Sequence, residues 1–379
     1  MQNNVGPYVP SLVFIETTKA CEYSCRHCRA ESQSEPLPDE LTTAELKDTL
    51  DQIRGLSDTP PEVVITGGDF LLRKDIREII SHASSISLPF SASPAGSPLL
   101  TGDFMEFLRS HGVRSMSLSL DGIDEGTHDW LRRIPGSFDL TLNLIIEAKR
   151  MGINAQVNTT VIKRNIMELP NLVSILRDVG ITTWEVFFLI KTGRGIKVED
   201  ISPDEYMQVN RWLADLRDYG INIRTVEGPV FRVIKKIQEI QPEAVGMDLY
   251  QKLRKATIDL IGMPDHVRPS SGAAPPPRHF RGTLFIGYNG DVYPSGLFTA
   301  KLGSIRRSSL RDIISQGVDY LDPRNSGKLQ GRCGRCEFRE MCGGSRARAL
   351  AYTGNPFAED PACLYVPGMK MREVEERQH

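Results

Sequence analysis

The stretch SLVFIETTKACEYSCRHCRAE, residues 11–31, joins an apolar run to three closely spaced cysteines. The apolar part, 11–18, predicts a β-strand. Cys21, Cys25 and Cys28 follow it with the spacing C-x3-C-x2-C. Structural zinc sites take four ligands and a thiol redox motif needs two, so three cysteines with no fourth nearby indicate a different kind of site.

Working outward, similar apolar runs recur along the chain, and each is followed by a helical pattern. Strands are expected at 11–18, 61–68, 87–94, 115–122, 154–161 and 183–191. Strand and helix repeating every thirty residues or so predict a parallel α/β arrangement, and near-continuous apolar strands are typical of it. Six such units are too few for a closed eight-stranded barrel, which leaves a partial barrel or a doubly wound sheet.

Unusual segments lie where these strands end. TGGD (66–69) follows the second strand, SLDG (119–122) the fourth, NTT (158–160) lies in the fifth, and KTGRG (191–195) follows the sixth. In both candidate folds, function gathers at the carboxyl ends of the strands. The sequence therefore predicts one site shared by these segments and the first three cysteines.

The composition excludes several classes of function. The chain has 379 residues, 40% of them hydrophobic, and a formal net charge of −2, with no basic run to attract nucleic acid or a membrane surface. The N-terminal residues do not resemble a signal peptide, and no apolar run approaches the roughly 18 residues of a membrane span. We therefore expect a cytoplasmic protein, whose reducing surroundings favour metal-binding or catalytic cysteines over disulfides.

The other four of the seven cysteines lie near the C-terminus: Cys333, Cys336, Cys342 and Cys363, spaced C-x2-C-x5-C-x20-C. Four thiolates complete a closed site, and their spacing alone leaves zinc and a 4Fe–4S cluster both open. Three thiolates can hold a 4Fe–4S cluster by three of its irons, which leaves the fourth iron free to bind something else.

Between the two cysteine groups the pattern changes after the sixth strand. A helical insert is expected from residue 225, a Pro/Gly/Ser-rich linker at 268–279, and a β-hairpin at 283–296 with its turn at Asn289-Gly290. The expected domains are 1–224, 225–278 for the insert and linker, and 279–379.

The first cysteine group, with His27 as the aromatic residue before its last cysteine, resembles the signature of radical S-adenosylmethionine (SAM) enzymes. The resemblance implies a partial (β/α)6 TIM-like barrel, which agrees with the six units. It also implies that Cys21, Cys25 and Cys28 hold a 4Fe–4S cluster whose open iron binds SAM. Reductive cleavage of SAM then gives a 5′-deoxyadenosyl radical, which abstracts a hydrogen atom from the substrate.

The TGGD segment resembles the glycine-rich turn that carries the SAM amino group. Gly67 and Gly68 permit close approach of the backbone, and Asp69 offers a carboxylate to the ammonium. Family members often have Glu and then Pro where this chain has Asp69 and Phe70. TGGD alone is an ordinary turn sequence. Its assignment to SAM binding therefore depends on its position after the second strand.

Further SAM contacts are implied by the same resemblance. Ser119 and Arg132 resemble the pair that holds the SAM carboxylate, with Arg133 as a neighbouring alternative to Arg132. Asn158 and the backbone of 188–190 would lie beside the ribose and adenine. Each residue alone is an ordinary strand or surface residue.

The C-terminal region resembles the SPASM/twitch extension of radical SAM enzymes, which follows the barrel. A full SPASM domain has seven cysteines for two auxiliary clusters. Counting along the motif places Ser295 and Arg346 at positions where cysteines are expected, and 270–290 contains none. The resemblance thus implies one auxiliary 4Fe–4S cluster with four cysteine ligands, which relays electrons or shapes the site.

The segments GDVYPSGLF, GRCGRCEFREMCGGSRARALAYTGNP and DPACLY resemble the haem-pathway branch, which includes enzymes of haem d1 and alternative haem synthesis and relatives of unassigned substrate. The leading substrate is a tetrapyrrole side chain. Alternatives are a ribosomal peptide maturase, a carbohydrate or aminoglycoside dehydrogenase, and a zinc-binding interaction protein without activity. A flavodoxin or ferredoxin is the expected electron donor, and no nucleic-acid or membrane partner is expected. The oligomeric state stays open.

Overall fold

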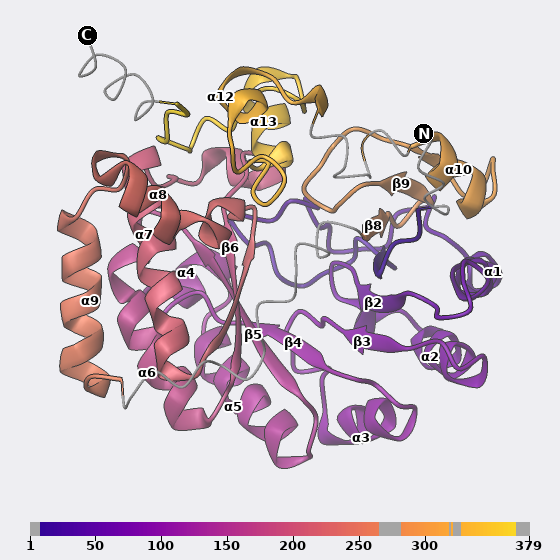
Figure 1. Ribbon diagram of the computed structural model, residues 1–379. Helices are drawn as coiled ribbons and strands as arrows, with labels where there is room; N and C mark the ends of the chain where they lie inside the picture. Colours follow the sequence, from indigo (N-terminus) through magenta and orange to yellow (C-terminus); the bar gives the residue numbers. More distant parts are fainter. Residues whose placement is uncertain (1–7, 265–281, 318–319, 321–326, 369–379) are drawn as a thin grey trace, which may run out of the picture. The chain divides into compact units, whose positions relative to one another are not determined.

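The computed structural model describes residues 8–264, 282–317, 320 and 327–368. The linker expected at 268–279 lies outside the described residues. The chain divides into two compact units (Figure 1). Unit 1 draws on Met1–Ser119, Arg132–Ala155 and Arg278–Pro323, and unit 2 on Leu120–Leu131, Gln156–Pro277 and Arg324–His379.

Unit 1 is built on a mainly parallel sheet. Its strands are β1 (Leu12–Glu16), β2 (Glu62–Thr66), β3 (Phe90–Ala92), β4 (Met116–Ser119), β8 (Thr283–Ile286), β9 (Asp291–Tyr293) and β10 (Gly303–Ser304). β1 lies between β2 and β8 and is parallel to both, with Val13 opposite Val63 and Leu284. β9 is antiparallel to β8, and Gly290 in the connecting turn has a φ of 85°. The expected hairpin is therefore confirmed.

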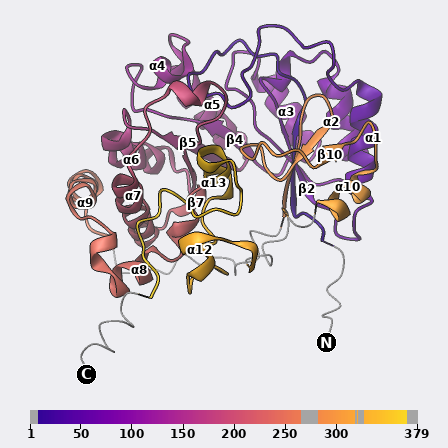
Figure 2. The ribbon, with the colours of Figure 1, turned by 90° about the horizontal axis from the view of Figure 1, so that it is seen from above.

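The helices of unit 1 follow the strands in sequence. They are α1 (Thr43–Arg54), α2 (Ile76–Ser85), α3 (Gly102–Ser110), α5 (Ser137–Arg150) and α10 (Leu310–Gln316), with the short 3-10 helix η1 (Phe70–Leu72) after β2. Figures 1 and 2 both show α1, α2 and α3 next to one another. A capping box between Thr42 and Glu45 starts α1, whose buried face carries Leu46, Leu50 and Ile53.

Unit 2 contains the parallel strands β5 (Ala155–Val161, whose first residue belongs to unit 1), β6 (Thr183–Phe188) and β7 (Asn222–Val226). Its helices are α6 (Leu169–Val179), α7 (Pro203–Asp215), α8 (Ile234–Ile240), α9 (Asp248–Ile261), α12 (Gly331–Arg335) and α13 (Arg346–Thr353), and α4 (His128–Arg132) ends at the unit boundary. Trp184 of β6 and Trp212 of α7 are fully buried and meet edge to face, with ring centroids 6.2 Å apart. This contact anchors α7 on the strands.

The six expected strand–helix units are all present, from β1–α1 to β6–α7. β7 was not expected, because its sequence NIRTV was not assigned to any element, yet it pairs with β6 in parallel. The insert is helical, as expected, but is divided into α8 and α9 around Pro242. The domain boundaries given above stay a prediction. In the described part of the chain, no helix is both long and apolar enough to cross a bilayer.

Candidate metal and SAM site

The first cysteine group forms a buried cluster in unit 1. Cys21, Tyr23 and Cys25 are buried together, and the neighbours that pack against them are Cys28, Ala95 and Ile134. Hydrogen bonds fix the loop, since Cys21 N donates to Gln33 O at 2.8 Å and Tyr23 Oη donates to Gly96 O at 3.0 Å. The three cysteines thus belong to one packed cluster on the loop that directly follows β1.

The TGGD turn after β2 lies against the entrance to this loop. Gly68 N donates to Thr18 O at 2.7 Å, and Asp69 N donates to Ala20 O at 2.6 Å. A β-carbon on Gly68 would come within 2.3 Å of Ala20 O, and one on Gly67 within 2.9 Å of Thr18 O. The two glycines are therefore required for the backbone of this turn to meet the backbone that leads to Cys21.

Asp69 is buried, with 1% of its surface exposed. Its Oδ2 accepts a hydrogen bond from Ser97 Oγ at 2.5 Å, and its Oδ1 accepts one from Leu71 N at 3.2 Å. Burial raises the pKa of the Asp69 carboxyl, while the bonds from Ser97 and Leu71 oppose that rise. An ionised carboxylate has about four lone-pair sites, so Asp69 retains capacity for an ammonium group.

Arg132, at the end of α4, lies beside the cysteine loop: its Nη1 donates to Cys25 Sγ at 3.9 Å. Arg133 is exposed, with a φ of 63°, so the structure favours Arg132 of the two for a role in the site. Ser119 is the last residue of β4 and is half-buried, as is His27 in the cysteine loop.

Asn158 lies in β5 of unit 2 and is half-buried. Its Oδ1 accepts a hydrogen bond from Gln156 Nε2 at 2.9 Å, and its main-chain oxygen accepts one from Leu120 N at 2.9 Å. Asp121, from the SLDG segment, accepts from Thr160 N at 2.7 Å and so ties that segment to β5. Residues 188–190 are buried at the end of β6.

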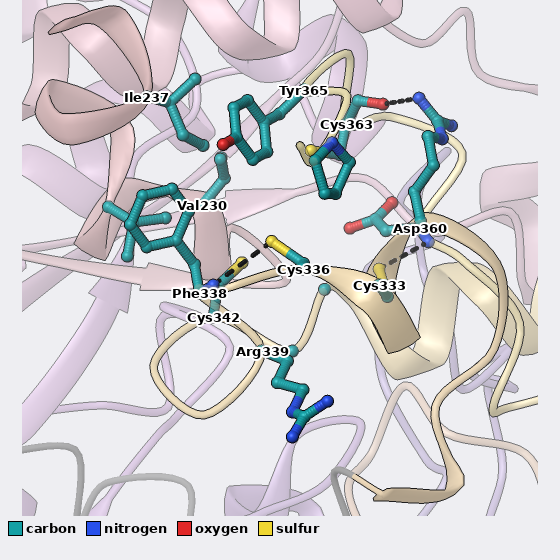
Figure 3. A pocket seen from close by; sticks show the side chains of 15 residues that line it. Val230, Ile237, Cys333, Cys336, Phe338, Arg339, Cys342, Asp360, Cys363 and Tyr365 are labelled. Carbon is teal, nitrogen blue, oxygen red and sulfur yellow. Dashed lines mark hydrogen bonds between the residues drawn. The ribbon is translucent and has the colours of Figure 1, made fainter. Parts of the chain in front are cut away.

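The second cysteine group lines a cavity in unit 2 that is partly open to solvent (Figure 3). The four thiols are those of Cys333, Cys336, Cys342 and Cys363. The apolar part of the wall comes from the insert and from the C-terminal segment, through Val230, Val233, Ile237, Phe338 and Tyr365. The insert, whose role the sequence left open, thus builds part of this cavity.

Main-chain N–H groups point at two of these sulfurs. Asp360 N donates to Cys333 Sγ at 3.3 Å, and Phe338 N donates to Cys336 Sγ at 3.4 Å. Burial raises the pKa of Cys336 to about 11 and that of Cys363 to about 12, and raises that of Cys342 further. Donors aimed at sulfur are characteristic of thiolates that ligate iron–sulfur clusters.

The donor sets of both groups fit clusters. All seven cysteines are free thiols. Burial first, and then the neighbouring Cys25, Asp69 and Cys28, raise the pKa of Cys21 to about 12, so a thiolate there needs a cationic partner such as iron. In the described residues, no three His, Cys, Asp or Glu side chains converge to hold a single metal ion. A 4Fe–4S cluster does not need that convergence, because each thiolate binds its own iron.

Comparison with known proteins decides the family. Residues 15–176 match the model of the radical SAM superfamily. The chain is also 31% identical over 367 residues to an AdoMet-dependent heme synthase of Methanosarcina barkeri, which covers 95% of this chain and 98% of that protein. This chain belongs to the radical SAM superfamily. It is thus an enzyme, and members of this superfamily use a 4Fe–4S cluster and SAM, which confirms these two expected cofactors.

Two further likenesses bear on fold and substrate. The solved structure described as anSMEcpe with bound AdoMet superposes with a TM-score of 0.65 at 13% identity, covering 97% of this chain and 95% of that one. This likeness confirms the expected barrel fold. A more distant relative, the PqqA peptide cyclase of Bradyrhizobium diazoefficiens, is 24% identical over 370 residues, which span 95% of this chain and 87% of that protein.

Sequence reasoning missed part of this candidate site. Tyr23 and Ser97 hold the loop after β3 against the cysteine loop and the TGGD turn, through Gly96 and Asp69. The available signals were weak: a tyrosine inside the cysteine motif, and the run of small residues SASPAGS at 91–97, which comes where the third strand ends. Small residues at a strand end permit close packing of loops, but they do not indicate which residue would contact a ligand.

Proposed function

We propose that this radical SAM enzyme modifies the side chains of a tetrapyrrole in haem-type biosynthesis. The observation that carries the proposal is the full-length similarity to an AdoMet-dependent heme synthase. The buried thiol group and the glycine turn packed against it supply the chemistry that such a reaction requires. A peptide substrate is the second candidate, because one relative is a peptide cyclase.

Cys21, Cys25 and Cys28 would hold the SAM-binding cluster. When bound, that cluster supplies the electron that cleaves SAM to methionine and a 5′-deoxyadenosyl radical. The chain's own residues place SAM: the backbone and carboxylate of 67–69 receive its ammonium group, and Ser119 and Arg132 its carboxylate. The guanidinium of Arg132, already beside Cys25, suits a carboxylate through paired N–H donors.

His27 lies in the cysteine loop and would contact the bound cofactor, and Asn158 with the backbone of 188–190 would bind the nucleoside. The four C-terminal cysteines would hold one auxiliary 4Fe–4S cluster in the cavity of unit 2. All four ligands come from protein, so this cluster would leave no iron open for substrate and would serve electron transfer. A flavodoxin or ferredoxin is the proposed external electron donor.

The proposal is tested on the full chain after anaerobic reconstitution. Metal and sulfide analysis should give about eight irons and about eight sulfides per chain, as expected for two clusters. The protein is then incubated with SAM, dithionite and either tetrapyrroles carrying propionate side chains or a panel of short peptides. Mass spectrometry should find 5′-deoxyadenosine together with a mass change in the tetrapyrrole only.

A matched pair of variants controls this experiment. Cys25→Ala should abolish formation of 5′-deoxyadenosine and retain about four irons, those of the auxiliary cluster. Glu22→Gln changes an exposed residue of the same loop and should behave as the parent. A mass change in a peptide with unaltered tetrapyrroles would favour the second candidate, and a colourless protein that binds only zinc would refute both.

A further inference from the structure

Several arginines lie in the segment that carries the second cysteine group, and their charges are neutralised in different ways. Arg332 pairs with Glu359 at 3.0 Å, and Arg339 lies 3.6 Å from Glu340. Buried Arg348 pairs with Asp360 at 3.3 Å. The positive charge of each of these side chains is therefore offset by a carboxylate within ion-pair distance.

Arg346, the first residue of α13, differs from them. Its Nη2 donates to Cys333 Sγ at 3.7 Å. Its other N–H groups donate to main-chain oxygens: Nε to Gly344, and Nη1 to Pro356 and Ala358 at 2.9 and 2.6 Å. Among the described residues no carboxylate lies within ion-pair distance of Arg346. Its charge acts on the Glu227 carboxyl from further away, lowering that pKa against the larger effect of burial, and its direct contact with a group that can be anionic is with Cys333 Sγ.

The backbone is shaped to allow this contact. Gly344 has a φ of 69°, and a β-carbon there would come within 2.5 Å of Arg346 Nη2 and 2.9 Å of Cys333 Sγ. The main-chain oxygens of Gly344, Pro356 and Ala358 accept hydrogen bonds from the guanidinium and hold it in its direction toward sulfur. Cys333 also accepts from Asp360 N, so two N–H donors converge on this one sulfur.

We propose that Arg346 raises the reduction potential of the auxiliary cluster by donating a charge-assisted hydrogen bond to its ligand Cys333. The inference rests on the proposed function, because it needs a cluster on the four C-terminal cysteines. Reduction adds one negative charge to a cluster that four thiolates already make anionic. A fixed cation and an N–H···S bond stabilise the reduced form more than the oxidised form, and this raises the potential.

Arg346 also occupies a particular position in the SPASM-like cysteine motif. Counting along the SPASM-like motif places a cysteine there, as a ligand of an auxiliary cluster that this chain lacks. In this chain an arginine at that position turns to the sulfur of the cluster that is retained. The change from ligand to hydrogen-bond donor makes Arg346 a positioning and tuning residue rather than a catalytic residue.

The test uses the full chain with Cys21, Cys25 and Cys28 replaced by alanine, so that only the auxiliary cluster gives a signal. The midpoint potential is measured by redox titration followed by electron paramagnetic resonance, with iron counted in each sample. Arg346→Gln should shift the midpoint to a more negative value. Arg346→Lys keeps the charge and should recover part of the shift.

Arg339→Gln is the matched control. Arg339 lines the same cavity but donates to Gly334 O and not to sulfur. The midpoint potential of the cluster in this variant should therefore stay near that of the parent protein. An unchanged midpoint in Arg346→Gln at full iron content would overturn the inference, as would loss of iron in both Arg346 variants, which would make the residue purely structural. A parent without iron would instead overturn the auxiliary cluster of the proposed function.

Discussion

Asp69 accepts a hydrogen bond from Ser97 at 2.5 Å, and this bond joins the loop after β2 to the loop after β3. The neighbouring Gly96 O accepts from Tyr23 of the cysteine loop at 3.0 Å. Three loops that follow successive parallel strands are thus linked by two hydrogen bonds. Because these bonds are buried or nearly so, they fix the loops more firmly than exposed bonds would.

The bond between Ser97 and Asp69 can be removed without touching the cysteines. Ser97→Ala leaves a buried carboxylate with one donor fewer, which should lower the free energy of unfolding by about 1–3 kcal/mol. We also expect weaker SAM binding at unchanged iron content, because the TGGD turn loses a support. Urea unfolding and calorimetric titration with SAM measure the two effects. Ser110→Ala, at an exposed serine, should change neither, and equal losses in the two variants would contradict the role of Ser97.

Gly68 offers a sharper test of the contact between the TGGD turn and the cysteine loop. A β-carbon in Gly68→Ala would overlap Ala20 O, so the backbone that leads to Cys21 has to move. The expected result is loss of iron from the first cysteine group, about half of the total, measured after reconstitution. Gly102→Ala is the control, since a β-carbon there meets nothing within 4 Å. Full iron content in Gly68→Ala would show that the close approach is not needed for cluster assembly.

Arg132 and its neighbour Arg133 form a natural comparison. Arg132→Gln removes the guanidinium beside Cys25 and should weaken SAM binding roughly tenfold or more, the effect of losing a charged hydrogen bond. Arg133→Gln changes an exposed side chain and should leave binding intact. Equilibrium titration with SAM on reconstituted protein measures both. If Arg133→Gln weakened SAM binding and Arg132→Gln did not, Arg133 would be the residue that binds the SAM carboxylate.

The repeating part of this fold could be predicted from sequence, whereas its local exceptions could not. The six strand–helix units follow from apolar runs such as VVIT at 63–66, whose side chains are alternately buried and half-buried. β7 was missed because NIRTV has only two strongly apolar residues, Ile223 and Val226, and its assignment as a strand depends on its pairing with β6. Pairing between distant segments is a tertiary effect that a local pattern does not contain.

The same contrast holds for the site. The cysteine ligands could be predicted from their spacing, because closely spaced cysteines in a reducing compartment usually bind metals or act in catalysis. Ser97 was not found, because a serine after a strand is common and its partner Asp69 is 28 residues away. The sequence marks Arg346 as a position without a cysteine and as one of several arginines near the last four cysteines, but it does not show which of them meets a sulfur. Its contact with Cys333 depends on the left-handed backbone of Gly344, which only the structure gives.

Glu45 should make stability depend on pH in the acid range. Hydrogen bonding from Arg306, with a smaller contribution from Thr42, lowers the pKa of Glu45 to about 2. In the unfolded chain the pKa is about 4.3, so the stabilisation is fully present above that pH and is lost as the pH falls toward 2. Because both side chains are about one-third exposed, we expect no more than about 1 kcal/mol. Urea unfolding of the parent and Glu45→Gln should therefore differ at pH 7 and converge near pH 2; a constant difference would contradict the ion pair.

The buried pair of Arg348 and Asp360 should matter most for the C-terminal cysteines. Asp360 accepts from Arg348 Nη1 at 3.3 Å and from Ser345 N at 2.7 Å, and its own N–H donates to Cys333 Sγ. The Arg348 guanidinium also lies 4.7 Å from the ring centre of Tyr206. Removing one member of a buried ion pair leaves the other uncompensated, at a cost of about 3–5 kcal/mol.

Arg348→Met should therefore loosen the segment that carries Asp360 and Cys363, and release iron from the second cysteine group while the first group keeps its own. Iron analysis combined with the yield of 5′-deoxyadenosine separates the two groups, because cleavage of SAM requires only the first. Arg335→Gln, at an exposed arginine of α12, is the control and should retain all iron. If Arg348→Met kept its full iron content and stability, the ion pair would not be what holds Cys333 and Cys363 in position.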